Sequence, residues 1–196
     1  MRTCLAIIMA ASMLPACATY EAGPSHPIHG VTPDGKPRWV RRGSGAYDGA
    51  NGKAFYGVGI VTGIQNISLA RQTSDNRARG SVASMFHAYI AKMMKDYQRS
   101  TTAGNFQASA EEQDVVAAQK TITEVTLRGV EIRDHWRDPQ SGALYALAIL
   151  DMNGIMKSLN DANRLNRRIA TYVRANARRA FNDLDKELAK KTARGH

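Results

Sequence analysis

Cysteine is scarce in this chain of 196 residues, which contains only Cys4 and Cys17. Both lie near the N-terminus, and Cys4 falls in a segment that we expect to be removed. The mature chain would then keep one cysteine, which cannot form an intramolecular disulfide. The same count excludes a cysteine-ligated metal site and a cysteine nucleophile in the folded part of the chain.

Long apolar runs are also missing. The longest covers residues 4–14 and follows the positive residue Arg2. It is too short to span a bilayer, which takes about 20 residues. A positive residue, a short apolar region and a small residue at its end are typical of a secretory signal peptide. We therefore predict a signal peptide over residues 1–16, cleaved between Ala16 and Cys17.

The residues at this cleavage site, Leu14-Pro-Ala-Cys17, resemble the lipobox of bacterial lipoproteins. The resemblance implies that Cys17 carries a diacylglyceryl thioether and is acylated on its freed amine, with a fatty acid such as palmitate. The alternative is an ordinary signal peptide with an incidental cysteine. Several acyl chains would anchor the protein stably, since each buried methylene contributes about 0.8 kcal/mol. Ala18 follows without an acidic retention signal, so resemblance to sorted lipoproteins predicts the periplasmic face of the outer membrane.

Proline is nearly absent after residue 37. Four of the six prolines fall between residues 24 and 37, and only Pro139 comes later. Such a segment propagates neither a helix nor a β-ladder, so residues 17–37 are predicted to form a lipidated tether. His26 and His29 have a spacing that suits a metal, but no third ligand is near, so no metal site is predicted.

The rest of the chain predicts an α+β fold, in which a long helix packs on a small antiparallel β-sheet and a long basic C-terminal helix follows. Asn66 fits the N-cap of the long helix. A turn at 138–142 separates two strand-like runs and indicates a hairpin. We divide this region into an α+β domain, 38–151, and a basic helix, 152–196. The expected elements are a short strand or anchoring segment at 38–40, a polar loop at 41–52, strands at 54–62, 126–136 and 143–151, and helices at 67–98, 110–124 and 153–191.

The helix expected at 67–98 has a one-sided face whose residues recur every three or four positions. The small residues in the first half of this face would allow close approach to a sheet. His87 lies off the face, and we interpret it as a surface residue. The face comprises Ala70, Ser74, Ala78, Val82, Met85, Tyr89, Met93 and Tyr97, and the charged residues expected in solvent are Asp75, Arg77, Arg79, Lys92 and Lys95.

Three glycines, Gly57, Gly59 and Gly63, follow one another before this helix. Their order invites a dinucleotide-binding interpretation, but the spacing is one residue too long and no ribose-binding acid follows at the required distance. Glycines that let a helix or strand pack close to this strand explain the pattern better.

Basic residues outnumber acidic ones by ten, or by nine once Arg2 is removed. In a cytosolic protein this excess would suggest nucleic acid. Outside the cytosol it favours lipid headgroups, cell-wall carboxylates or an acidic protein, so no nucleic-acid partner is predicted. Residues 151–196 alone hold eleven basic and five acidic residues. Solvated charge is the alternative explanation. The candidate interaction residues on this helix are Arg164, Arg167, Arg168, Arg174, Arg178 and Arg179.

The sequence contains no motif typical of a catalytic site: there is no Ser-His-Asp ordering, no metal-ligand cluster and no phosphate-binding loop. Asp134, Asp138 and Asp151 flank the predicted hairpin, where solvated strand ends explain them equally well. A strongly raised pKa at one of them would indicate acid–base chemistry. We therefore predict a protein that is not an enzyme and that holds no cofactor.

Short motifs along residues 37–151 suggest a family. They are PRWV at 37–40, FYGVG at 55–59, LAR and NRA at 69–78, GVEIRDHW at 129–136 and LYALA at 144–148. With the Cys17 lipobox, they resemble the bacterial Lpp-twenty lipoprotein family. The chain departs from the family in its polar insert, 99–125, and in its basic tail.

The resemblance implies a small antiparallel sheet with a long helix on it, in a membrane-anchored, non-enzymatic envelope protein. Some relatives belong to flagellar structures at the outer membrane. The expected function is therefore a structural or protein-interaction role, with a protein partner or self-assembly into a homo-oligomer. The alternatives are a binding module for acidic cell-wall or lipid groups and an accessory part of a flagellar structure.

Overall fold

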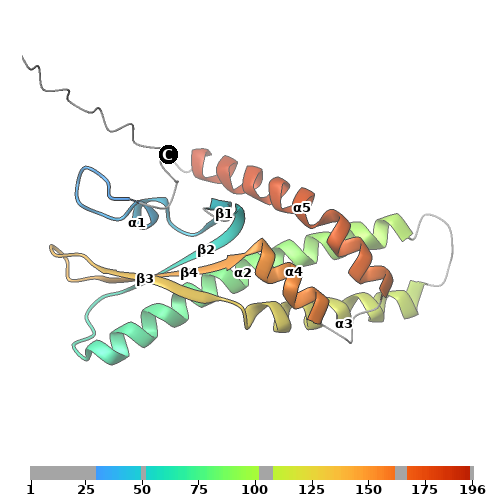
Figure 1. Ribbon diagram of the computed structural model, residues 1–196, viewed down its shortest axis with the longest axis horizontal. Helices are drawn as coiled ribbons and strands as arrows, with labels where there is room; N and C mark the ends of the chain where they lie inside the picture. The colour runs from blue at the N-terminus through green and yellow to red at the C-terminus, as the bar shows by residue number, and fades with distance from the viewer. Residues whose placement is uncertain (1–29, 50–51, 102–107, 162–166, 195–196) are drawn as a thin grey trace, which may run out of the picture.

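The computed structural model describes residues 30–49, 52–101, 108–161 and 167–194. The predicted signal peptide, Cys17, His26, His29 and Arg164 lie outside these ranges. Figure 1 shows a small sheet with a long helix along one face and further helices beside it. No helix in the described part of the chain is long and apolar enough to cross a membrane.

The sheet has four antiparallel strands in the order β1-β2-β4-β3. Its central pair runs in register from Ala54 opposite Asp151 to Val61 opposite Leu144. The predicted α+β class is therefore confirmed. The predicted hairpin is also present, and it pairs the edge strand β3 with β4 from Glu131 opposite Ile149 to Arg137 opposite Leu144. The strands are β1 (Gly45–Gly49), β2 (Gly52–Val61), β3 (Glu131–Arg137) and β4 (Leu144–Asp151).

The long helix α2 (Ile67–Thr101) lies across β2, close enough for the backbones of the two elements to be in contact. Asn66 caps it, since its side chain accepts the backbone N–H of Leu69 at 3.0 Å. A Cβ at Gly57 would lie 2.1 Å from the carbonyl oxygen of Ala78, and one at Gly59 would lie 2.1 Å from that of Ser74. The close-packing interpretation is therefore confirmed for Gly57 and Gly59. It was wrong for Gly63, which has open space around it and a φ of +75°, a backbone conformation that favours glycine.

The predicted face of α2 is buried along its whole length, apart from the half-buried Met85. Phe86, Ile90 and Met94 are also buried, although they were not among the residues predicted for that face. They are buried because the second half of α2 also contacts α3 (Ala108–Leu127) and α5 (Arg167–Arg194). A helix with several neighbours buries more than one stripe of side chains.

Of the charged α2 residues expected in solvent, Arg77, Arg79 and Lys95 are exposed, while Asp75 and Lys92 are half-buried. Arg77 donates to the carbonyl of Ile60 and Arg79 to that of Val130, each at 2.5 Å. These bonds attach α2 to the sheet, so the prediction of purely solvated side chains was incomplete.

The helix predicted at 110–124 is present but longer, and the strand expected from residue 126 begins only at Glu131. Thr126 is the last buried residue of the helix, and Gly129 follows in the turn. Alternation from residue 126 therefore suggested strand where the chain is still helical. The cause is tertiary, since Thr126 is fully buried, a position that local pattern does not reveal.

The structure corrects two predictions near the start of the domain. Residues 38–42 form a short helix, α1 (Arg38–Arg42), where a strand or anchoring segment was expected. The predicted loop at 41–52 contains β1, which pairs with β2 from Gly45 opposite Tyr56 to Gly49 opposite Gly52. A five-residue segment with three glycines or alanines has little intrinsic preference for strand. It forms a strand because it pairs with β2.

The predicted tether extends too far at its C-terminal end. Val31 pairs with Pro37 across a tight turn, and the carbonyl of Gly30 accepts the N–H of Arg38 at 3.0 Å. Lys36 lies 3.7 Å from the carboxylate of Asp138 at the tip of the β3–β4 hairpin. Residues 30–37 therefore belong to the folded domain, which leaves residues 17–29 for a tether.

The C-terminal region contains two helices, so the prediction of one continuous helix at 153–191 was wrong. α4 (Met152–Asp161) packs against α3, and α5 packs across α2 and β1. Each helix buries apolar residues against a different neighbour, so α4 and α5 run in different directions. Asp151 begins α4, since its side chain accepts the N–H of Gly154 at 2.5 Å.

Candidate interaction surfaces

The orientation of α5 is set by a buried stripe of apolar residues. Ile169, Val173, Ala177 and Phe181 are almost fully buried. The Phe181 ring packs edge-on against Phe55 of β2, with 5.1 Å between ring centroids. The hydroxyl of Tyr89 on α2 donates to the carbonyl of Ala177 at 2.7 Å. These contacts fix the rotation of α5 about its axis, and its remaining residues must face outward.

The arginines singled out on this helix lie on its outer side. Arg164 is outside the described residues, and the other five are all exposed: Arg167, Arg168, Arg174, Arg178 and Arg179. No acidic residue occurs between positions 167 and 182. The exposed charges on the first half of α5 are therefore all positive.

Three of these side chains line one flank of the helix. With 100° per residue, Arg167, Arg174 and Arg178 fall within about 40° of one another. We call these three the arginine flank. None of the three guanidinium groups contacts a carboxylate among the described residues, whereas Arg179 donates to the side chain of Asn176. The charge of the flank is therefore not neutralised within the described domain.

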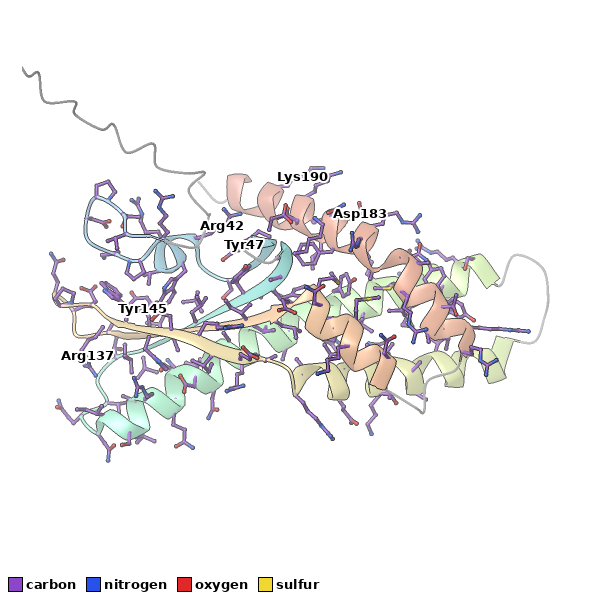
Figure 2. The ribbon with its side chains drawn as sticks, in the orientation of Figure 1. Arg42, Tyr47, Arg137, Tyr145, Asp183 and Lys190 are labelled. Carbon is purple, nitrogen blue, oxygen red and sulfur yellow. The ribbon has the colours of Figure 1, made fainter. Side chains whose placement is uncertain are left out.

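The second half of α5 has mixed charge. The carboxylate of Glu187 forms an ion pair with Lys92 of α2, at 2.5 Å between Oε1 and Nζ. The hydrogen bond that Lys92 donates to Glu187 raises the pKa of Lys92 above its usual value. Figure 2 shows Asp183 and Lys190 on the outer side of this half. Mixed charge is typical of a solvated surface, in contrast with the first half of the same helix.

A pocket of about 260 Å³ adjoins the arginine flank. It lies between the β1–β2 connection, the start of α4 and α5, and Arg178 reaches it from α5. Lys53 pairs there with the exposed carboxylate of Asp48 at 3.3 Å. Lys53 and Arg178 thus meet beside the N-terminal end of α4, which the carboxylate of Asp151 caps. The pocket is lined by Asp48, Gly52, Lys53, Met152, Asn153 and Arg178.

The sheet face opposite α2 presents a second candidate surface. α1 covers part of this face with Trp39, whose indole N–H donates to Asp134 at 2.9 Å. Beyond α1, Ile60, Tyr145 and Trp136 stand side by side on three neighbouring strands. Ile60 is 44% exposed, and the other two are half-buried. We call these three residues the aromatic row; Figure 2 shows Tyr145 on it.

The aromatic row was not identified as a surface from the sequence. In β4, Ala146, Ala148 and Leu150 are buried on the α2 side of the sheet, and Leu147 is buried on the other side. Tyr145 is only half-buried, and it contacts the Trp136 ring at 5.4 Å between centroids. The exposure of the row depends on where α1 ends, and alternation along one strand does not contain that information.

The three acids near the hairpin have structural partners. Asp134 accepts the indole N–H of Trp39, and Asp151 caps α4. The backbone N–H of Gln140 donates to Asp138 at 3.0 Å and holds its pKa below the usual range. This direction is opposite to the raised pKa that would have indicated an acid catalyst at Asp138.

His135 makes a polar contact with Asp75 that was not predicted from the sequence. Its Nε2 lies 2.5 Å from the carboxylate of Asp75, which joins edge strand β3 to α2. Both side chains are half-buried. The pair spans a sequence separation of 60 residues, so only the packing of α2 on the sheet brings it together.

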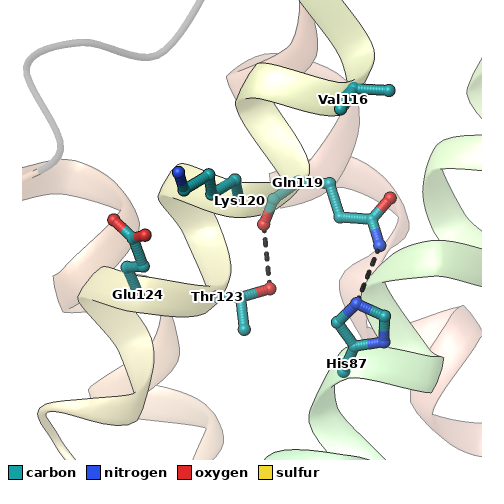
Figure 3. Close-up of a pocket in the computed structure, with 6 residues that line it drawn as sticks. All are labelled: His87, Val116, Gln119, Lys120, Thr123 and Glu124. Atoms are coloured by element: carbon teal, nitrogen blue, oxygen red, sulfur yellow. Dashed lines mark hydrogen bonds between the residues drawn. The ribbon is translucent and has the colours of Figure 1, made fainter.

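His87 is exposed, as the sequence predicted, and borders a groove between α2 and α3. Figure 3 shows His87 facing Gln119, at 3.3 Å between side-chain nitrogens. The groove has a volume of about 290 Å³, and Val116 and Lys120 also line it. Among the described residues, no group of three His, Cys, Asp or Glu side chains is placed to hold a metal.

Comparison with known proteins adds no relative. No protein-family model matches the chain, and no curated protein matches it either. The resemblance to the Lpp-twenty family therefore stays a prediction from the motifs.

Proposed function

We propose that this chain is a membrane-anchored envelope lipoprotein, acylated at Cys17, with a non-enzymatic role in structure or protein interaction. The observation that carries the proposal is the sequence Leu14-Pro-Ala-Cys17 directly after an apolar run that begins behind Arg2. The anchor would hold the domain at the periplasmic face of the outer membrane.

The position of the folded domain supports an anchored protein. All the strongly buried residues of the described domain lie between Trp39 and Phe181. Twelve residues, 18–29, separate Cys17 from the first described residue, Gly30. A chain of that length reaches roughly 20 Å as a coil and roughly 40 Å when extended. The described core is thus built from residues after position 38, and the segment before residue 30 would connect the domain to the membrane.

The aromatic row supports a protein-interaction role. Aromatic residues are enriched where proteins contact partners, because they bury large areas at low cost in conformational entropy. Tyr145 and Trp136 present such groups on an open part of a sheet face, with the aliphatic side chain of Ile60 beside them. This surface suits a protein partner or a second copy of the chain.

A second candidate function is a binding module for acidic lipid or wall groups. The observation that favours it is the first half of α5, which has five exposed arginines and no acidic residue. This function is compatible with the anchor and differs from the first in its salt dependence. Binding through exposed charges weakens as salt screens them.

The test of the proposal is intact-mass measurement combined with membrane fractionation, on the wild type and on Cys17→Ala. We expect a wild-type chain that starts at Cys17, carries added acyl mass and is found in the outer-membrane fraction. The Cys17→Ala variant should lack both the mass and the localisation.

A matched Ser12→Ala variant, changed within the apolar run, should behave as the wild type because it keeps the residues of the cleavage site. Two outcomes would contradict the proposal. One is a wild-type chain without acyl mass that is recovered as a soluble protein. The other is a Cys17→Ala chain that keeps the same mass addition and fractionation as the wild type.

A further inference from the structure

The arginine flank has no internal structural task in the described domain. The apolar stripe of α5 already holds the helix, through Val173, Ala177 and Phe181. Arg167, Arg174 and Arg178 contact no carboxylate among the described residues and are exposed. Unpaired like charges on one helix repel one another at i,i+4, so their clustering lowers rather than raises the stability of the isolated helix. The cluster therefore points to an anionic partner outside the domain.

The spacing of the flank fits a surface with many anionic groups. At 1.5 Å rise per residue, Arg167 and Arg174 are about 10 Å apart along the axis, and Arg174 and Arg178 about 6 Å. A single small anion cannot span these positions. A planar array of phosphate groups can meet all three at once, and each guanidinium can bind a phosphate with two parallel hydrogen bonds.

The pocket beside Arg178 would let one phosphate enter more deeply. Its volume of about 260 Å³ is several times the share of one water molecule in the liquid, about 30 Å³. Lys53 adds positive charge, whereas the N-terminal end of α4 is already capped by the carboxylate of Asp151. Asp48 opposes the positive charge and pairs with Lys53, but its side chain is 71% exposed, so the pair is weak and can yield to a phosphate.

The position of the chain start agrees with a membrane partner. The described chain begins beside α1, since the carbonyl of Gly30 accepts the N–H of Arg38. β1 directly follows α1 in the chain, and its residue Asp48 lines the pocket together with Arg178 of α5. A tether that leaves beside α1 would bring α5 within its reach of the membrane surface.

We propose that the first half of α5 docks on anionic phospholipid headgroups, with Arg167, Arg174 and Arg178 on the headgroup phosphates and the Arg178 pocket taking one of them. The inference rests on the proposed function, since only an anchored domain stays near a membrane. It adds to the acyl anchor a second contact that sets the orientation of the domain. An acyl anchor combined with a basic surface is a known physical route to stable attachment.

The test is vesicle co-sedimentation of residues 17–196 with Cys17→Ser, which contains the whole core and lacks the lipid. The vesicles are phosphatidylcholine alone or mixed with phosphatidylglycerol. We expect binding to the anionic vesicles only, and a steep loss as ionic strength rises from about 0.01 M to about 0.15 M, which shortens the Debye length from about 30 Å to about 8 Å. Equal binding to both vesicle types would overturn the proposal.

Variants locate the contact. Each arginine near an anionic surface contributes roughly a factor of five, so Arg167→Gln/Arg174→Gln/Arg178→Gln should weaken partitioning roughly 100-fold. The control Arg71→Gln/Lys95→Gln/Arg128→Gln removes the same charge from exposed positions on α2 and beyond α3. Binding by the arginine variant equal to the wild type, or an equal loss in the control, would contradict the proposal.

A soluble headgroup compound distinguishes docking on a membrane surface from binding of a single phosphate group. Glycerol phosphate at matched ionic strength should not displace the protein from vesicles, because one phosphate lacks its neighbours. Displacement would instead assign the pocket to a soluble phosphate compound and overturn docking on a surface. All samples lack the acyl group, so failure here leaves the Cys17 proposal intact, and failure of acylation leaves this binding result interpretable.

Discussion

The two faces of the sheet are closed by different means. On one face, α2 lies so close to β2 that no side chain fits at Gly57 or Gly59. On the other face, a five-residue helix holds a single indole, Trp39, over a cluster with Tyr47 and Tyr56. The first face depends on the absence of side chains along a long contact, and the second on the presence of one large side chain.

This difference has a functional consequence. α2 is long enough to cover its face of the sheet, and the core there continues into α3, α4 and α5. α1 is short, so the aromatic row beyond it stays half-open. The tightly closed face supplies stability, and the partly closed face supplies surface for a partner. Four predictions test this division, from the largest expected effect to the smallest.

The largest effect is expected at the glycines. A Cβ at Gly59 meets backbone atoms of Ser74 and Ala78, which cannot rotate away. Gly59→Ala should therefore displace α2 and cost more than about 4 kcal/mol in the free energy of unfolding. Urea unfolding followed by circular dichroism measures the cost.

Gly80→Ala is the matched control, because Gly80 lies within α2 with open space around it. It should stabilise the protein by about 1 kcal/mol, the difference in helix propensity between the two residues. A Gly59→Ala variant as stable as the wild type would refute the close-contact account of this face.

The second effect is expected at Trp39. Removing this buried indole by Trp39→Ala leaves a cavity over the second face and should cost about 3–5 kcal/mol. Trp39→Phe keeps a ring but loses the hydrogen bond to Asp134, and it should cost less. Unfolding in urea gives both values. A loss below about 1 kcal/mol for Trp39→Ala would mean that α1 does not close this face.

The third effect is a loss of stability at alkaline pH. Burial raises the pKa of Tyr56 to about 12, and the nearby carboxylates of Asp151 and Asp48 act in the same direction. The unfolded state then releases its proton at lower pH than the folded state. Stability should be fully present below about pH 10 and should fall by about 3 kcal/mol toward pH 12.

Tyr56→Phe should remove this share of the pH dependence. Burial also raises the pKa of Tyr47 on the same face and of Tyr89 on the α2 face, so the wild type loses stability through all three. Free energies of unfolding at several alkaline pH values provide the measurement. An unchanged slope in Tyr56→Phe would contradict the assignment to this phenol.

The smallest effect is expected at the other tryptophan. Trp136 lies on the same face as Trp39 but is half-buried, and its main ring contact is Tyr145. Trp136→Ala should cost about 1 kcal/mol, the usual worth of an aromatic pair. A cost as large as that of Trp39→Ala would show that the aromatic row is part of the core and not an open surface.

Sequence patterns located the elements whose signals are local. Asn66 and the repeat that follows it predicted where α2 begins, and the turn before Ala143 predicted the hairpin of β3 and β4. The glycines of β2 indicated close packing without naming their partner. The candidate arginines of α5 were likewise visible as an acid-free run, because charge is written directly in the residue types.

Long-range contacts decided the rest. β1 and α1 have weak signals of their own, and each exists because β2 and Asp134 lie opposite it. The same dependence separates α4 from α5 and turns the arginines outward, since Phe181 must reach Phe55. The sequence by itself determined which residues carry charge, cap helices or lack a side chain. Only the tertiary structure decided which of them face one another, because burial depends on neighbours that are distant along the chain.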